Sequence, residues 1–329
     1  MKVRNKRRPW RLPRPDRSFW LKAAISTLLL AFILIRFEPG DVWQSVRSAQ
    51  WNHVLLAALL SPLILAIKVL RWLILGRQVA RRLRPGEAAV SLLAGMGLGL
   101  VTPGRVGELA RVSYLPVPEK SRFVGFVAID RALDLATLLL AGAVAAAIAL
   151  QLRAMAAAFI IPVVISLALL FVPGLPAALV ARVASWRSIP WKKQIARIAA
   201  GLATLTGRVL ALIFLLSLIT FALGTYQFFW LLRSFYAATS PAAAAVSFPM
   251  LTVAGVLPVT VGGLGTREGA SVLVLSLYHI PEAAALSATL LSFILNTLLP
   301  GVIGLLLAPA ISTGGRQSEP PPLSTLSES

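Results

Sequence analysis

The sequence predicts an all-α protein that crosses a lipid bilayer several times, and three observations predict it. First, 57% of its 329 residues are hydrophobic and only 13% are charged, whereas soluble domains carry about 25% charged residues. Second, several apolar runs reach or approach the roughly 20 residues that a helix needs to cross a bilayer. Third, most of the basic residues lie in short loops beside these runs, as in multi-pass membrane proteins.

The apolar runs divide the chain into about six full spans and two shorter, broken segments. We expect the full spans at residues 19–35, 53–75, 123–150, 155–172, 209–232 and 283–308. These spans belong to one helical membrane domain, residues 19–308. Residues 1–18 are basic, and because no small-x-small cleavage site follows the first apolar run, we expect a retained tail rather than a signal peptide. Residues 309–329 are rich in Ser and Pro, a composition that predicts a disordered tail.

The distribution of charge sets the orientation and the class of partner. Residues 77–84 and 173–208 contain many Lys and Arg and no acid, so both loops are predicted to be cytoplasmic. In this topology the two tails are cytoplasmic as well. The formal charge of +20 can indicate a nucleic-acid-binding protein, but its placement beside the spans indicates membrane orientation and attraction to anionic lipids. We therefore expect membrane lipids as partners and no nucleic acid.

Two apolar segments are broken by Pro and Gly before they have crossed the bilayer. The first runs over residues 88–101, and its break residues are Pro103, Gly104 and Gly107. The second begins at residue 241, and its break residues are Pro258, Gly262, Gly263 and Gly265. Irregular backbone at membrane depth is tolerated only where protein buries it or it lines a cavity. The predicted topology brings these segments in from opposite faces, a pattern typical of inverted repeats in transporters, although the two motifs do not align residue by residue.

Eight ionisable residues are predicted to lie at membrane depth beside the breaks and in the third span. They are Arg105, Glu108, Arg111, Asp130, Arg131, Asp134, Arg267 and Glu268. Charge inside a membrane indicates a functional site by default, and arginines beside glycine-rich breaks favour phosphate or carboxylate oxygens. An anionic lipid headgroup is the ligand that we expect. The structural alternative is an ion network that only holds the helices together.

Other site classes have less support. There is no cysteine, and His53 and His279 both lie near a predicted membrane face, so we expect no metal site and no cofactor. The glycine-rich stretch 262–265 lacks the preceding strand and the Lys-Ser/Thr of a nucleotide-binding loop. Asp130 and Asp134 could form a metal–phosphate pair of the kind that lipid phosphotransferases use, but no acidic partner motif precedes them.

Three motifs resemble those of the lysylphosphatidylglycerol synthase transmembrane-region family, which comprises flippase-like membrane proteins. They are Pro103-Gly104-Arg105-Val106-Gly107-Glu108-x-x-Arg111, Asp130-Arg131-x-x-Asp134-Leu135 and Gly262-Gly263-Leu264-Gly265-x-Arg267-Glu268. The resemblance covers roughly residues 20–308 and implies a bacterial inner-membrane protein. Many members have Glu where this chain has Asp130. The resemblance implies the lipid-translocating half alone, because no aminoacyl-transferase domain is expected after residue 308, and it does not fix the substrate.

The leading hypothesis is a flippase for a phosphate-containing lipid, with no enzymatic activity. In it Arg105, Arg111 and Arg267 contact the headgroup, the four acids hold the arginines, and Arg131 pairs within the third span. The alternatives are a membrane glycosyl- or phosphotransferase acting on a polyprenyl phosphate and a membrane scaffold that transports nothing. The sequence leaves the lipid, the direction and the oligomeric state open.

Overall fold

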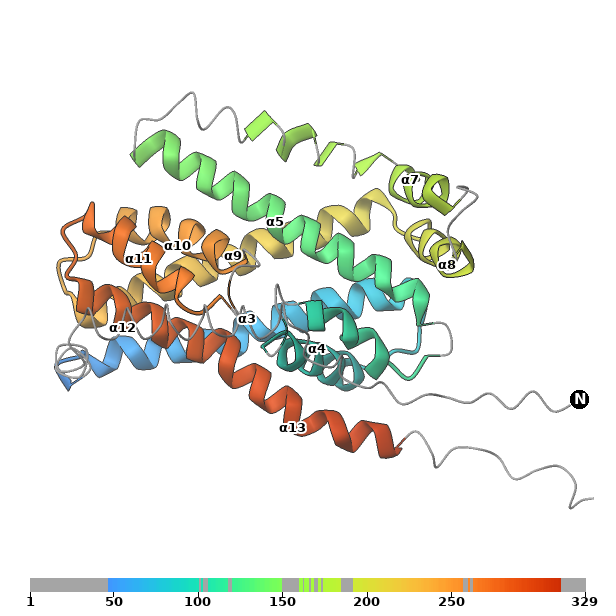
Figure 1. The fold of residues 1–329 in the computed structure, drawn as a ribbon, viewed down its shortest axis with the longest axis horizontal. Coiled ribbons are helices and arrows are strands. Elements are labelled where there is room, and N and C mark those ends of the chain that lie inside the picture. Colours follow the sequence, from blue (N-terminus) through green and yellow to red (C-terminus); the bar gives the residue numbers. More distant parts are fainter. Residues whose placement is uncertain are drawn as a thin grey trace, which may run out of the picture.

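The protein is a bundle of helices that run roughly side by side (Figure 1). The computed structural model describes residues 47–314 except 101, 103–105, 118–119, 150–159, 162, 166, 169–170, 173, 185–191, 257–259 and 261–262. The described residues contain helices and no strand, which confirms the predicted all-α class. Three helices are long and apolar enough to span a membrane: α3 (Trp51–Arg77), α9 (Gly207–Phe235) and the run Glu282–Leu307. The first predicted span, half of the fourth, and residues 1–18 and 315–329 of the two tails lie outside the described residues, whereas residues 309–314 of the predicted disordered tail are helical.

Helices α3 and α9 are antiparallel, and this fixes the direction of the two broken segments. The Gln50 backbone N–H donates to the Ser234 carbonyl at 2.9 Å, so the start of α3 lies beside the end of α9. Helix α4 (Pro85–Leu100) follows the end of α3, and α10 (Pro241–Val256) follows the end of α9. Because those ends lie at opposite sides of the bundle, the two segments enter from opposite sides. The predicted opposed entry is confirmed.

Each broken segment forms a hairpin with the element that follows it. Helix α4 packs against η1 (Val106–Tyr114), a 3₁₀ helix, and α10 packs against the α-helix α11 (Thr266–Ser276). Before α11, Gly263 and Gly265 have φ values of +76° and +84°, which glycine adopts without steric cost. The two returning legs are therefore different helix types, so any repeat relating the halves is imperfect.

Glycines allow η1 to lie directly on α4. A Cβ added at Gly107, in η1, would lie 2.2 Å from the Leu98 carbonyl oxygen. A Cβ added at Gly95, in α4, would lie 2.6 Å from Arg111 Cβ, and one added at Gly99 would lie 2.8 Å from Glu108 Cγ. The sequence did not predict η1, because its pattern shows only a Pro/Gly break there; Gly107, predicted as one of the break residues, lies inside this helix. This close approach positions the two charged residues of η1, Glu108 and Arg111.

The third predicted span is the continuous helix α5 (Ser121–Ala149), and the sixth is divided. Helix α12 (Glu282–Phe293) continues through a π-helical turn, η2 (Ile294–Leu298), into α13 (Leu299–Gly314). Helix α13 packs on α4, where a Cβ at Gly97 would lie 2.5 Å from the Gly301 carbonyl oxygen and one at Gly304 would lie 1.8 Å from that of Leu93. These pairings are antiparallel, so α13 ends on the side where α4 begins.

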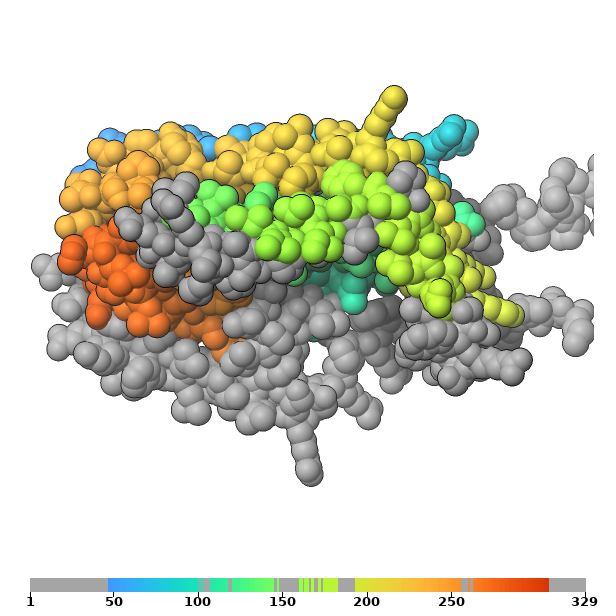
Figure 2. All heavy atoms as spheres, turned by 90° about the horizontal axis from the view of Figure 1, so that it is seen from above, coloured from blue at the N-terminus to red at the C-terminus, as the bar shows by residue number. Residues whose placement is uncertain are grey.

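That side also carries the described basic loops. Two short helices, α7 (Leu175–Ala184) and α8 (Lys192–Leu202), pack against each other, and α8 packs against α5. A Cβ at Gly201 would lie 2.4 Å from the Arg122 carbonyl oxygen, so α8 lies at the start of α5. In Figure 2 the yellow residues of α9 lie beside the lime residues, which include α7. The orange residues of α11 lie at the opposite end of the bundle from α7.

Two apolar clusters lie at the two ends of the bundle. One contains Trp72, Phe123 and Ile213, among others, and the second contains Ala57, Phe228 and Leu275, among others. Along α9, the first cluster ends near Ile213 and the second begins near Phe228. Between them, Ser217, Thr220, Phe221 and Gly224 line a cavity that also contains charged side chains. The candidate site is thus in the middle of the bundle, half-way between its two hydrophobic cores.

Candidate functional site

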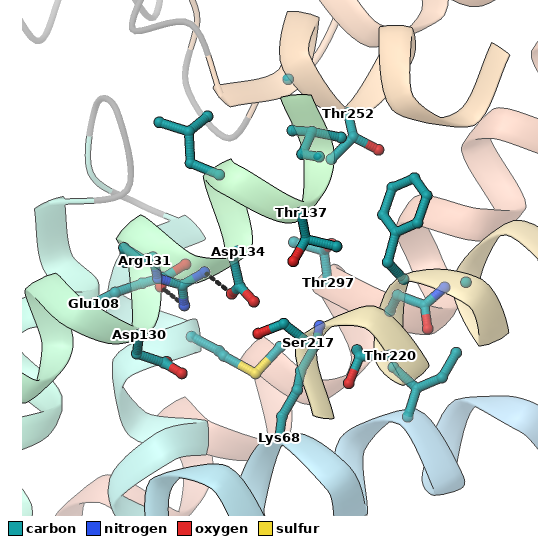
Figure 3. A pocket seen from close by; sticks show the side chains of 18 of the residues that line it. Lys68, Glu108, Asp130, Arg131, Asp134, Thr137, Ser217, Thr220, Thr252 and Thr297 are labelled. Carbon is teal, nitrogen blue, oxygen red and sulfur yellow. Dashed lines mark ion pairs between the residues drawn. The ribbon is translucent and has the colours of Figure 1, made fainter. Parts of the chain in front are cut away.

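A cavity of about 350 Å³ lies at the centre of the bundle and receives side chains from both hairpins. Its charged lining consists of four basic and three acidic residues: Lys68, Arg71, Arg131, Arg267, Glu108, Asp130 and Asp134. Apolar side chains such as Ile64, Leu138 and Phe248 complete the wall. Figure 3 shows Lys68 reaching in from α3 while Glu108, Asp130, Arg131 and Asp134 gather on the other side. The described lining therefore carries one excess positive charge.

Helix α5 organises the charged wall. Asp130 and Asp134 are four residues apart, and this spacing places them on one face of the helix. Arg131 lies 3.6 Å from Asp134 through its Nη1, as the spacing of three residues predicts. These three residues lie within little more than one turn of the same helix. The other charged side chains of the cluster extend from their own elements to this segment of α5.

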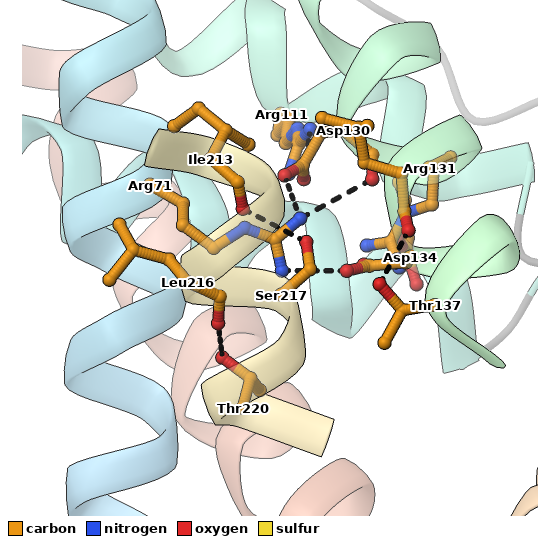
Figure 4. A network of polar contacts seen from close by, with 12 residues as sticks. Arg71, Arg111, Asp130, Arg131, Asp134, Thr137, Ile213, Leu216, Ser217 and Thr220 are labelled. Atoms are coloured by element: carbon orange, nitrogen blue, oxygen red, sulfur yellow. Dashed lines mark hydrogen bonds and ion pairs between the residues drawn. The ribbon is translucent and has the colours of Figure 1, made fainter. Parts of the chain in front are cut away.

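Arg71 of α3 binds both aspartates at once. Its Nη2 lies 2.5 Å from Asp130 Oδ1 and its Nη1 lies 2.6 Å from Asp134 Oδ1 (Figure 4). The guanidinium fork suits two carboxylate oxygens better than the single ammonium of lysine does. The side chain of Arg71 is only 2% exposed, so its guanidinium is shielded from water, and its two ion pairs hold α3 against α5.

Arg111 of η1 is a buried member of the cluster and does not line the cavity. Its side chain has no exposed surface, its Nη2 lies 3.1 Å from Asp130 Oδ2, and its guanidinium carbon lies 4.0 Å from the centre of the Trp72 ring. Trp72 donates to Ser91 Oγ, and Ser91 donates to the Arg111 carbonyl at 2.7 Å. Arg111 is therefore fixed from several directions and keeps Asp130 in place, rather than facing a ligand.

Arg131 and Asp134 form the accessible edge of the cluster. Arg131 pairs with Glu108 of η1, and its side chain is 45% exposed; that of Asp134 is 34% exposed. An exposed ion pair exchanges partners at lower cost than a buried one. Arg131 is therefore the described arginine best placed to exchange a carboxylate partner for an anionic ligand.

Hydroxyl groups of α9 and α10 also line the cavity. Ser217 and Thr220 on α9 donate to the carbonyls of Ile213 and Leu216, and Thr252 on α10 donates to Phe248. In each case the acceptor lies four residues earlier in the same helix. The hydroxyl oxygens keep lone pairs with which they can accept hydrogen bonds. This wall is polar without carrying charge.

The second hairpin contributes Arg267. Its guanidinium carbon lies 5.7 Å from the centre of the Phe293 ring, and its side chain crosses α10 at Gly255, where a Cβ would lie 2.6 Å from Arg267 Cδ. Neighbouring Glu268 does not line the cavity. Its Oε2 accepts from the Gly265 backbone N–H at 2.7 Å, which caps the start of α11. Glu268 thus orients the helix that presents Arg267.

A hydrogen-bonded bridge crosses the bundle on another side of the cavity. Gln227 Nε2 donates to the Ala57 carbonyl and to Ser61 Oγ, each at 2.7 Å. Asn296 Nδ2 donates to Gln227 Oε1 at 2.7 Å and to the Ser292 carbonyl. Because both carbonyls can only accept, the orientations of the two amides are fixed. Asn296 lies in the π-helical turn η2, so this turn is anchored to α3 and α9.

The structure places the sequence-predicted residues in three groups. Glu108, Asp130, Arg131, Asp134 and Arg267 line one cavity. Arg111 and Glu268 lie behind its wall. Arg105, Pro103, Gly104, Pro258 and Gly262 lie outside the described residues, and their roles stay predictions.

Sequence reasoning missed Arg71 and Lys68, because basic residues near the end of a span also serve as orientation signals. The signal that could have identified them is their distance from the end of the span. Helix α3 continues to Arg77, so Arg71 is about 9 Å before its end at 1.5 Å per residue. A basic residue that deep needs an acidic partner.

The fold and the site define a multi-pass, all-α membrane protein with a charged central cavity between two opposed hairpins. The family model described as "Lysylphosphatidylglycerol synthase TM region" matches residues 19–304, and the chain belongs to this family. The predicted family is confirmed. A "UPF0104 membrane protein" of Methanothermobacter thermautotrophicus (strain Delta H) is 32% identical over 116 residues, covering 33% of this chain and 34% of that protein. The match thus spans about a third of that curated relative.

Proposed function

We propose that the protein moves a phosphate-containing lipid headgroup between the leaflets of a bacterial inner membrane, through the central cavity. The observation that carries this proposal is the placement of a charged cavity between two hairpins that enter from opposite sides. Binding near the midplane between opposed broken segments is the arrangement of alternating-access transporters.

The charge of the cavity favours an anionic ligand. Its described lining holds one more basic than acidic residue, and Arg131 lies at its accessible edge. A phosphate that pairs with Arg131 would displace Glu108 or Asp134 from that guanidinium. The buried part of the cluster, Arg71, Arg111 and Asp130, would stay as it is and hold the site open. Arg267 and, by prediction, Arg105 would contact the same headgroup from the two hairpins.

The membrane phosphotransferase hypothesis requires carboxylates that are free to hold a metal. Asp130 and Asp134 instead bind Arg71, and Glu108 pairs with Arg131. Among the residues that the structure describes, no group of three or more acids, histidines or cysteines is placed to hold a metal ion. These contacts favour transport over metal-assisted transfer as the function of the site.

The orientation proposed here puts both chain ends in the cytoplasm. The basic loop after α3, the helix α8 and the end of α13 all lie on one side of the bundle (Figure 1). A concentration of Lys and Arg on one side favours the cytoplasmic face for that side.

The proposal is tested by reconstituting the protein into proteoliposomes that contain fluorescently labelled phosphatidylglycerol, lysyl-phosphatidylglycerol or a polyprenyl phosphate. Wild type is compared with Arg131→Gln, and Arg82→Gln, an exposed loop residue, is the matched control. We expect wild type and the control to translocate at least one lipid class and Arg131→Gln to be at least about tenfold slower, because one charge-assisted contact contributes about 1.5–3 kcal/mol. Equal rates for Arg131→Gln and wild type, or no transport of any class by folded protein, would contradict the proposal.

A further inference from the structure

We propose that an apolar groove beside the cavity, between α5, α9 and α10, holds a hydrocarbon chain of the lipid whose headgroup enters the cavity. The groove has a volume of about 480 Å³, and the residues that line it include Leu140, Val144, Leu218, Ala242, Ala245 and Val246. This inference rests on the proposed function, because it names how the same lipid is held outside the charged site.

The described residues of the groove offer few hydrogen-bonding groups to a ligand. Among them, Thr137 and Thr225 are the polar ones. Their hydroxyls donate to the carbonyls of Leu133 and Phe221, each four residues earlier in the same helix, at 2.9 and 3.0 Å. Apart from the acceptor lone pairs of these two hydroxyls, the described lining presents carbon atoms, which suit a hydrocarbon chain.

The groove adjoins the charged cavity. Thr137 and Phe221 line both spaces. Along α5, Asp134, Thr137, Ala141 and Val144 follow at spacings of three and four residues, so they share one face of the helix. That face changes from charged to apolar over ten residues, about 15 Å. This length is half of the roughly 30 Å hydrocarbon thickness of a bilayer, the depth that one leaflet's chains occupy.

The groove also opens to the outside of the bundle. Val144 is 44% exposed, and the side chains of Ala242 and Ala245 are exposed as well. The small alanine side chains of α10 create the space between it and α5. A chain lying there stays in contact with the bilayer while the headgroup occupies the cavity. A lipid that enters sideways from one leaflet can therefore place its hydrocarbon chain in the apolar groove and its headgroup in the charged cavity.

The test fills the groove without changing a charge. Ala245→Phe fills it from α10, and Ala141→Phe is a second variant from α5, so that loss of folding in one leaves the other informative. Ala222→Phe is the matched control, because Ala222 is exposed on α9 and does not line the groove. The probe is phosphatidylglycerol with a diazirine near the end of one acyl chain, cross-linked by light in nanodiscs. Labelled residues are mapped by mass spectrometry.

We expect wild type and Ala222→Phe to be labelled at residues of the groove, and labelling there to fall at least fivefold in the groove variants. We also expect it to fall in Arg131→Gln, because that change removes the headgroup contact. Undiminished labelling in both groove variants, or label spread evenly over exposed faces, would overturn the inference. Groove labelling that is insensitive to Arg131→Gln would show a chain site independent of the cavity and would also overturn it. If groove labelling behaves as expected but no lipid is translocated, the binding inference stands and the transport proposal fails.

Discussion

Arg71 on α3 and Asp130 on α5 form a buried ion pair of 2.5 Å at the centre of the bundle. The two residues are 59 positions apart in the chain, and both lie on helices that run through the bundle. Around this pair, Arg111, Arg131, Asp134 and Glu108 bring the cluster to three positive and three negative charges. A charge-balanced, buried core with an exposed edge suits a site that must stay folded while its edge exchanges partners.

Removing Arg71 should destabilise the protein more than removing Arg131. Arg71→Ala leaves two aspartates without their shared partner, and breaking a buried pair costs about 3–5 kcal/mol. We expect a markedly lower melting temperature in detergent, measured by fluorescence-detected size-exclusion chromatography after heating. Arg71→Met combined with Asp134→Asn, which keeps Asp130 paired with Arg111 and the cluster balanced in charge, should recover part of the loss. An Arg71→Ala protein as stable as the Arg82→Ala control would show that the pair does not hold α3 to α5.

Arg131→Gln should separate function from stability. The Arg131 side chain is 45% exposed and that of its partner Glu108 is 10% exposed, so this pair contributes less than a fully buried one and more than an exposed one. We therefore expect a melting temperature between those of wild type and Arg71→Ala, together with slow lipid transport. Glu108→Gln removes the acidic partner and should leave Arg131 free for phosphate, so it should not weaken binding of phosphatidylglycerol, measured by native mass spectrometry. A large stability loss in Arg131→Gln would indicate a purely structural residue.

The close contact between α4 and α13 should not accept a side chain. In Gly304→Ala the new methyl would lie 1.8 Å from the Leu93 carbonyl oxygen, and overpacking costs about 1–3 kcal/mol. Gly269→Ala is the control, because nothing lies within 4 Å of its added Cβ, and alanine favours helices over glycine by about 1 kcal/mol. Thermal unfolding should rank Gly269→Ala at or above wild type and Gly304→Ala below it; the reverse order would contradict the described packing.

The membrane orientation can be measured directly, since the sequence has no cysteine. Arg82→Cys and Glu282→Cys each introduce a single thiol at an exposed residue on opposite sides of the bundle. In intact cells a membrane-impermeant maleimide should label Glu282→Cys and not Arg82→Cys. Labelling of Arg82→Cys alone would place the basic side outside the cytoplasm and reverse the proposed topology.

The helices and their opposed entry could be predicted because both depend on signals within the chain. Apolar length, Pro/Gly breaks and loop charge located α3, α5 and α9 and the two hairpins. The 3₁₀ helix η1 could not be predicted, because it depends on glycines of α4 that allow Glu108 and Arg111 to lie against that helix. The π-helical turn was also missed, since the contact between Asn296 and Gln227 spans 69 residues.

The charged cluster was predicted only in part, for a related reason. Periodicity places Asp130 and Asp134 on one face of α5, but the partner from α3 follows from packing. The buried position of Arg111 over Trp72 likewise depends on tertiary contacts that one sequence does not show.

The most direct test of the central claim is an experimental structure of the protein in nanodiscs that contain phosphatidylglycerol or the lipid class translocated in proteoliposomes. We expect headgroup density in the central cavity, with a phosphate within hydrogen-bonding distance of Arg131, while the pair between Arg71 and Asp130 stays intact. A headgroup bound elsewhere on the protein, with the cavity empty and Arg131 still paired with Glu108, would contradict the central claim.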